Sequence, residues 1–280
     1  MNISNWSKLA YQKLINVHNC QLDIEVLLMF VLKKNKSWII GFNDYQLSLK
    51  EINQLDQLLI RRSLGEPIAY LIGEKEFWSL VFRVSKDTFI PRPDSEILVE
   101  LCLHKLCDVK RAKILDLGTG SGAIAISIAY NKNDCHVVGV DYQQKILSVA
   151  QYNANKLNIK NINFILSDWF YSLKSCMFDI IVSNPPYISY NEFSCIQSVL
   201  KYEPMNALVS NYNGLADIQY IINNASNYLY NHGWLLIEHS WNQKIMVQKI
   251  FFQNNFINIK TYKDFGKNDR VTIGQKIINK

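Results

Sequence analysis

One short stretch, Ser183-Asn184-Pro185-Pro186-Tyr187, combines hydrogen-bond acceptors with a rigid backbone and directly follows an apolar run. Asn184 offers a side-chain carbonyl, and Pro185 offers a backbone carbonyl with no N–H beside it. Because a residue before proline is driven into an extended conformation, the two prolines stiffen these acceptors into one wall. The Tyr187 ring can pack against a planar group. The stretch is therefore suited to bind a planar amide or amino group.

A glycine-rich turn, Asp116-Leu117-Gly118-Thr119-Gly120-Ser121-Gly122, lies between an apolar run and a helical pattern. Its glycines allow a tight turn and the close approach of a ligand, and the following helix presents free N–H groups. Asp141 ends the next apolar run about 20 residues after Gly120, where a carboxylate can accept both ribose hydroxyls. The pattern fits a dinucleotide as well as an adenosyl cofactor, and Asp116 before the turn favours the adenosyl cofactor of methyltransferases.

A further polar and aromatic pair, Asp168-Trp169, follows a third apolar run. The acid can accept the amino group of adenine, and the indole can stack on the ring. We therefore expect S-adenosylmethionine to bind at the glycine turn and at the ends of the next two strands. The candidate cofactor contacts are Gly118, Thr119, Gly120, Ser121, Gly122, Asp141, Asp168 and Trp169.

An amide nitrogen is a poor nucleophile because its lone pair is delocalised into the carbonyl. A site that methylates such a nitrogen must hold both N–H groups and leave the lone pair facing the methyl group. Positioning and preorganised acceptors can do this without a metal or a covalent nucleophile. We therefore predict Asn184, Pro185 and Tyr187 as catalytic residues, and the same three with Pro186 as the substrate site.

Strands alternate with helices from Lys113 onwards, which predicts an α/β domain with a parallel sheet and helices on both faces. Residues 5–64 have helical patterns, whereas residues 68–72 and 77–84 have strand-like content. We therefore predict a hairpin that turns at Gly73-Glu74-Lys75. The predicted strands of the α/β domain are Lys113–Leu117, His136–Val140, Ile162–Leu166, Phe178–Val182, Trp234–Glu238, Phe256–Tyr262 and Arg270–Ile277.

The composition is that of a globular protein, with 280 residues, 49% of them hydrophobic and 19% charged. The net charge of +6 is spread along the chain, so no nucleic-acid-binding arm is expected. The six cysteines form no Cys-x-x-Cys pair and the histidines show no ligand spacing, so we expect neither disulfides nor a metal. With no visible signal peptide and no apolar stretch of ~20 residues, the chain is expected to be soluble and cytoplasmic.

Several stretches besides Asn184–Tyr187 carry a family resemblance. They are Gly65-Glu66-Pro67-Ile68-Ala69-Tyr70, Glu76-Phe77-Trp78, Phe89-Ile90-Pro91-Arg92-Pro93-Asp94 and Tyr202-Glu203-Pro204. Over nearly the whole chain they resemble the bacterial release factor glutamine methyltransferases (the PrmC/HemK family). The resemblance implies a helical substrate-recognition domain over 1–66, a β-hairpin linker over 67–93 and a class I, Rossmann-like methyltransferase domain over 94–280. Ser240 and Gln275 depart from the family pattern, where Gly and Arg are expected.

The resemblance also implies a reaction and a partner. A methyl group would pass from S-adenosylmethionine, leaving S-adenosylhomocysteine, to the side-chain nitrogen of the Gly-Gly-Gln glutamine in class I release factors. Asn184 would then contact the cofactor as well as the substrate. We further expect a monomer with no membrane and no direct nucleic-acid partner. The stretch Phe89–Arg92 is expected to border the cofactor pocket, and neither it nor His239 has an assigned role.

Three other classes of protein share parts of this pattern. An adenine or cytosine N-methyltransferase acting on nucleic acid would share the cofactor site and Asn184–Tyr187. It should also carry a basic recognition domain, and residues 1–64 have mixed charge. A nucleotide-binding scaffold for the ribosome would not need an intact Asn184–Tyr187 stretch. A nicotinamide dehydrogenase would need a proton donor, and no motif places one.

Overall fold

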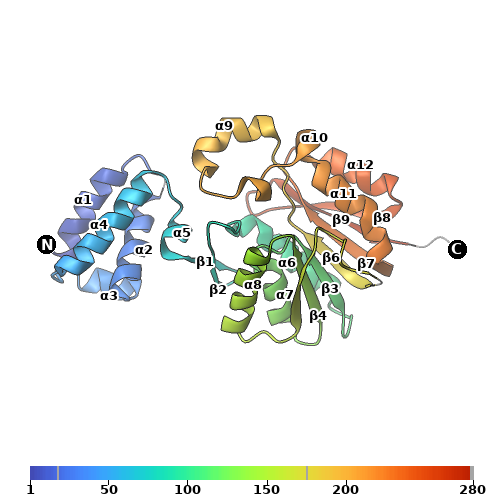
Figure 1. Cartoon of the computed structure of the whole chain (residues 1–280), viewed down its shortest axis with the longest axis horizontal. Helices are drawn as coiled ribbons and strands as arrows, with labels where there is room; N and C mark the ends of the chain where they lie inside the picture. The colour runs from blue at the N-terminus through green and yellow to red at the C-terminus, as the bar shows by residue number, and fades with distance from the viewer. Residues whose placement is uncertain (18, 175, 278–280) are drawn as a thin grey trace. The chain divides into compact units, whose positions relative to one another are not determined.

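The computed structural model describes residues 1–17, 19–174 and 176–277. It divides the chain into two compact units, Met1–Glu74 and Lys75–Lys280 (Figure 1). No helix in these described ranges is long and apolar enough to cross a membrane.

The first unit consists of helices around a core of their own, as the periodicity predicts. Ser48 begins the longest helix with a capping box, in which its hydroxyl accepts from the Glu51 amide and the Glu51 carboxylate accepts from the Ser48 amide. The Trp6 indole is 1% exposed and donates to Asp56 at 2.9 Å. The helices are α1 (Ile3–Leu14), α2 (Cys20–Leu32), α3 (Lys36–Gly41), α4 (Leu49–Ser63) and α5 (Ile68–Ile72).

The helix α5 occupies residues 68–72, so the strand predicted there is wrong. Pro67 stands at its N-cap with φ −57°, and the amides of Tyr70 and Leu71 donate to the Pro67 carbonyl at 3.0 and 3.2 Å. Gly73 ends the helix with φ 75°. A short apolar run fits a buried helix as well as a strand, and here a preset proline and a left-handed glycine frame a single helical turn.

A hairpin is present near the predicted place, but it pairs other residues than predicted and turns elsewhere. Strands β1 (Glu74–Phe77) and β2 (Leu80–Arg83) are joined by Trp78 and Ser79, whose φ angles are 53° and 58°. Positive φ at both central residues is the pattern of a type I′ turn. Neither residue favours this conformation, so the turn was not visible in the sequence, and Gly73-Glu74-Lys75 only leads into the first strand.

The second unit is built on a seven-stranded sheet in the order β5-β4-β3-β6-β7-β9-β8. The strands are β3 (Lys113–Leu117), β4 (His136–Asp141), β5 (Ile162–Leu166), β6 (Phe178–Ser183), β7 (Leu229–Glu238), β8 (Phe256–Lys263) and β9 (Asp269–Lys276). In this order, the five strands β5, β4, β3, β6 and β7 are parallel to one another. Strand β9 is antiparallel to both β7 and β8. All seven predicted strands are confirmed, and the sheet is mostly parallel.

Helices cover both faces of this sheet, because successive side chains of a strand point to opposite sides. Ile114 and Ile180 pack into a core with α6 (Glu96–Lys105) and α7 (Ala123–Asn131). Leu115 and Ile181, one position further on, pack with α11 (Ala216–Ala225) and α12 (Lys244–Gln253) on the other face (Figure 1). The remaining α-helices of the described part of the unit are α8 (Gln144–Lys156), α9 (Tyr190–Leu200) and α10 (Asn211–Gly214), and short 3₁₀ helices span Pro93–Ser95, Met205–Ala207 and Ser226–Tyr228.

Candidate active site

The glycine turn and the Asn-Pro-Pro-Tyr stretch leave the sheet side by side. β3 and β6 are parallel neighbours with Leu117 opposite Ser183, and the Ser183 hydroxyl donates to the Leu117 carbonyl at 2.8 Å. The order of the strands reverses between β3 and β6. Open parallel sheets bind their ligands beyond the carboxyl ends of the strands at this point of reversal.

The glycine turn requires its glycines. Gly118, Gly120 and Gly122 have φ angles of 71°, 57° and 83°, a region that side chains rarely allow. A Cβ at Gly122 would also stand 2.8 Å from the end of the Ile126 side chain and 3.2 Å from the Ala150 Cβ, so neighbouring side chains would have to move. The backbone can therefore come close to a ligand at this turn.

Asp116 supports the turn from behind. The Thr119 hydroxyl donates to its carboxylate at 2.7 Å, and Asp116 is 1% exposed. Burial raises the pKa of Asp116 to about 7, against the opposing effect of hydrogen bonds from Thr119 and the Ala125 amide. The side chain does not line the cavity described below, so its visible function is to order the loop.

Asp141, at the end of β4, can accept further hydrogen bonds. Its Oδ2 accepts from the Gly120 amide at 3.1 Å, while its Oδ1 is buried without a partner among the described residues. Burial raises the pKa of this carboxyl. A buried acceptor without a donor is costly, and a pair of ribose hydroxyls would satisfy it. The acceptor at this position therefore fits an adenosyl group.

Trp169 and Asp168 form the next wall. Trp169 adopts φ 45°, and its indole lies so close to the glycine turn that a Cβ at Gly118 would stand 3.5 Å from the ring. The Ser167 hydroxyl donates to the Trp169 carbonyl at 2.8 Å and holds this unusual backbone. Asp168 beside it is exposed. A flat aromatic face with an adjacent carboxylate suits an adenine ring.

One cavity of about 880 Å³ brings the predicted residues together. This volume lies in the range of small-molecule and cofactor sites. Of the predicted site residues, only Gly122 does not line it. The lining includes Gly118, Thr119, Gly120, Ser121, Asp141, Asp168, Trp169, Asn184, Pro185, Pro186 and Tyr187.

Two further segments of the wall were not assigned from chemistry. Phe89, Pro91 and Arg92 line the cavity from one side, as do residues 206–208 from another. Glu203, whose side chain is 3% exposed, accepts from the Ile90 amide at 3.4 Å and forms an ion pair with Arg92. It therefore ties together two segments that are far apart in the sequence. The only sequence signal for this contact was the family resemblance of both stretches.

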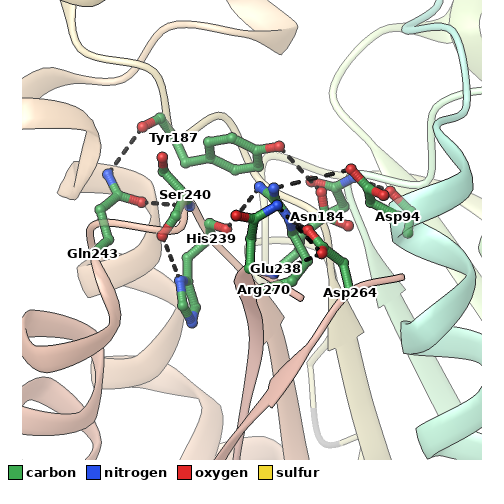
Figure 2. A network of polar contacts seen from close by, with 11 residues as sticks. Asp94, Asn184, Tyr187, Glu238, His239, Ser240, Gln243, Asp264 and Arg270 are labelled. Carbon is green, nitrogen blue, oxygen red and sulfur yellow. Dashed lines mark hydrogen bonds and ion pairs between the residues drawn. The ribbon is translucent and has the colours of Figure 1, made fainter. Parts of the chain in front are cut away.

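The Asn-Pro-Pro-Tyr stretch is anchored from behind by a polar network (Figure 2). The Asn184 amide nitrogen donates to the Ser95 hydroxyl at 2.9 Å, which leaves Oδ1 available to accept from a ligand. The Tyr187 hydroxyl donates to Glu238 at 3.2 Å, and the Gln243 amide donates to the Tyr187 carbonyl at 3.0 Å. Burial and the Glu238 charge raise the pKa of Tyr187 well above its usual range, so this phenol stays protonated.

Glu238 and His239, at the end of β7, are both buried but have different hydrogen-bond partners. Glu238 is 1% exposed, and burial raises its pKa to about 7. Sequence reasoning missed this residue, although a carboxylate at the end of an apolar strand is a signal of a site. The His239 ring is fully buried, and its two nitrogens pair with the Ser240 carbonyl and the Thr272 hydroxyl, each at 2.8 Å. His239 is therefore a satisfied core residue.

The sheet and its cavity place the second unit in the class of S-adenosylmethionine-dependent methyltransferases. A family model described as a methyltransferase domain matches residues 108–275, and one described as the PrmC N-terminal domain matches residues 6–73. The 16S rRNA N2 G1207 methyltransferase (RsmC) of T. thermophilus, solved in complex with AdoMet and guanosine, has a TM-score of 0.55 and 21% identity. The match covers 72% of this chain and 49% of that one, and at this identity it shows the fold alone.

Two curated relatives define the family. The release factor glutamine methyltransferase of Buchnera aphidicola subsp. Acyrthosiphon pisum (strain APS) is 50% identical over 276 residues, which cover 99% of each chain. That of Escherichia coli (strain K12) is 42% identical over 275 residues, which cover 98% of this chain and 99% of its own. The chain belongs to the family of release factor glutamine methyltransferases.

Proposed function

We propose that this protein transfers a methyl group from S-adenosylmethionine to the side-chain amide nitrogen of the glutamine in the Gly-Gly-Gln motif of class I peptide chain release factors. This modification would support translation termination. The observation that carries the proposal is the orientation of Asn184. Its amide nitrogen donates a hydrogen bond to the Ser95 hydroxyl, so its carbonyl oxygen can accept an N–H of an amide that enters the cavity. The names of the relatives support the same substrate.

The cofactor would be held by the part of the cavity wall beside that stretch. We assign its methionine part to the turn Gly118–Gly122, its ribose to Asp141, and its adenine to Asp168 and Trp169. The free Oδ1 of Asp141 and the indole above Gly118 support these assignments. When bound, the cofactor supplies a methyl group made electrophilic by its sulfonium. Asn184 would border both ligands, because it follows β6 next to the glycine turn.

The chain's contribution to the reaction is to hold the amide still. Asn184 Oδ1 and the Pro185 carbonyl would each accept one N–H, so the nitrogen lone pair points away from both acceptors. Pro186 keeps this wall rigid, and the Tyr187 ring would pack against the planar amide. Fixed acceptors of this kind lower the barrier without reorganising during the reaction.

We further propose that residues 1–66 recognise the release factor, that 67–93 link the two parts and that 94–280 carry the transfer. The match of residues 6–73 to the PrmC N-terminal domain supports a specialised N-terminal part. We also propose that the protein acts as a monomer in the cytoplasm, where release factors work, without binding nucleic acid directly.

The test is to incubate the purified protein with labelled S-adenosylmethionine and an unmodified release factor, then to locate the label by peptide mass. A methyl group on the Gly-Gly-Gln glutamine is the expected result. A release factor with that glutamine replaced by glutamate is the matched control and should take no label. Label in added RNA or DNA, with none in the release factor, would keep the cofactor site and overturn the proposed substrate.

A further inference from the structure

Glu238 is a buried carboxylate that the proposed reaction does not use. It is the last residue of β7, and it does not line the cavity. Its Oε1 accepts from the Tyr187 hydroxyl, and its Oε2 has no partner in the described part of the chain. Burying a carboxylate is costly, so a carboxylate directly behind the Asn-Pro-Pro-Tyr stretch needs an explanation.

Ser95 connects this carboxylate to Asn184. The Ser95 oxygen accepts from the Asn184 amide nitrogen at 2.9 Å, and the Ser95 hydroxyl lies close enough to Glu238 to favour the ionised form of that carboxyl. A hydroxyl has one hydrogen to donate, and an ionised carboxylate can only accept. When the Ser95 hydrogen points to the ionised Glu238, Ser95 can only accept from Asn184. The amide of Asn184 is then locked with its nitrogen towards Ser95.

We infer that Glu238 is a positioning residue, whose carboxylate orients the Asn184 amide through Ser95 and the Tyr187 ring directly. This inference rests on the proposed function, because it concerns the acceptor that would hold the substrate amide. A flipped Asn184 would present N–H groups to the substrate N–H groups, and the substrate would lose an acceptor.

The charges around Glu238 decide when it can act in this way. Arg270 of β9 and the Tyr187 hydroxyl favour the ionised carboxylate, whereas Asp94 before α6 disfavours it. Arg270 is itself held by Asp264 at 3.0 Å and lies 3.9 Å from Asp94 (Figure 2). With burial as the largest influence, the pKa of Glu238 is about 7. A protonated Glu238 could donate to Ser95 and release the lock on Asn184.

The test compares Glu238→Gln and Ser95→Ala with Ser127→Ala. Ser127 is a fully buried serine in α7 that does not line the cavity, and its hydroxyl has no partner among the described residues. For methylation of a release factor, kcat should fall about 10- to 100-fold in both test variants, as it does when a partner that orients a metal-ligating side chain is removed. The Kd for S-adenosylmethionine should stay unchanged, and Ser127→Ala should keep the full kcat.

The dependence of kcat on pH separates positioning from a structural effect. In the wild type, kcat should fall as the pH drops through about 7, and Glu238→Gln should lack this inflection. Suppose that the wild type methylates the release factor. The inference is overturned if Glu238→Gln and Ser95→Ala both keep the wild-type kcat. It is also overturned if the pH inflection persists in Glu238→Gln. If Glu238→Gln does not fold, the kcat of Ser95→Ala decides. A wild type that leaves the release factor unmodified would instead overturn the proposed function.

Discussion

Gly214 lies against the backbone of Tyr187 so closely that a Cβ at 214 would stand 2.0 Å from the Tyr187 carbonyl oxygen and 2.7 Å from its carbonyl carbon. Gly214 also has φ 81°, which side chains rarely adopt. The same carbonyl oxygen accepts from Gln243 at 3.0 Å. Gly214, at the end of α10, and Gln243, just before α12, therefore fix the position of Tyr187, the last residue of the Asn-Pro-Pro-Tyr stretch.

Replacing Gly214 by alanine should damage both stability and turnover. The new methyl group meets backbone atoms that cannot rotate away, in a conformation unfavourable for alanine. We expect a loss of more than about 2 kcal/mol in the free energy of unfolding, and a lower kcat because Tyr187 must move. Gly41→Ala in α3, where no described atom outside its own helix backbone and chain neighbours lies within 4 Å of the new Cβ, is the control and should be neutral or slightly stabilising. Denaturant unfolding and methyl transfer would measure both effects, and a Gly214→Ala protein as stable as the wild type would contradict this account of the contact.

Replacing Asn184 by alanine should abolish most turnover and change cofactor affinity by much less. The variant loses the side-chain acceptor, whereas the glycine turn and Asp141 remain. Removal of one preorganised hydrogen-bonding group lowers kcat by about 10²–10³. Single-turnover methyl transfer would measure the loss, and calorimetry would measure the Kd for S-adenosylmethionine. Turnover at the wild-type rate would rule out the role assigned to Asn184.

Replacing Asp141 by asparagine should weaken the binding of S-adenosylmethionine and leave the rate of methyl transfer nearly unchanged. The change removes a charged acceptor but keeps the size of the side chain, and a hydrogen bond to a charged group contributes about 1.5–3 kcal/mol. We expect the Kd for S-adenosylmethionine to rise about 10- to 100-fold, with kcat near the wild-type value at saturating cofactor. Asp134→Asn, at an exposed carboxylate that accepts from the Arg111 amide, is the control and should leave the Kd unchanged. A Kd for Asp141→Asn equal to that of the wild type would exclude Asp141 as the ribose ligand.

Replacing Glu238 by glutamine should stabilise the folded protein at alkaline pH while it impairs catalysis. The pKa of Glu238 is raised from 4.5 to about 7, mainly by burial, so the fold favours the protonated form. The stability contributed by this group is complete below the unfolded value and is lost as the pH rises through about 7. Glutamine cannot ionise, and Arg270 keeps Asp264 as its partner. We expect a gain of about 1–3 kcal/mol at about pH 8 and little difference near pH 5, measured by urea unfolding. An equal effect at both pH values would contradict the titration of Glu238.

The chemistry-bearing residues could be predicted because each lies at the carboxyl end of a strand or within two residues after it. Asp116, Asp141, Asp168 and Asn184 end or follow apolar runs, and in a parallel sheet the ends of such runs share one edge. The same reasoning failed for residues 68–72, where a single apolar run is compatible with either kind of element. It also could not place the turn at Trp78 and Ser79, since neither residue has the preference for positive φ that marks a hairpin.

The sequence by itself therefore determined the fold class, the cofactor turn and the acceptor stretch, because these depend on local backbone preferences and on alternation along single strands. Only the tertiary structure decided what supports them. Ser95, Gly214 and Glu238 approach the acceptor stretch from segments far away in the chain, and Glu203 joins two separate parts of the cavity wall. Such contacts depend on how elements pack and on which polar groups become buried together. No periodicity or motif within one segment contains that information.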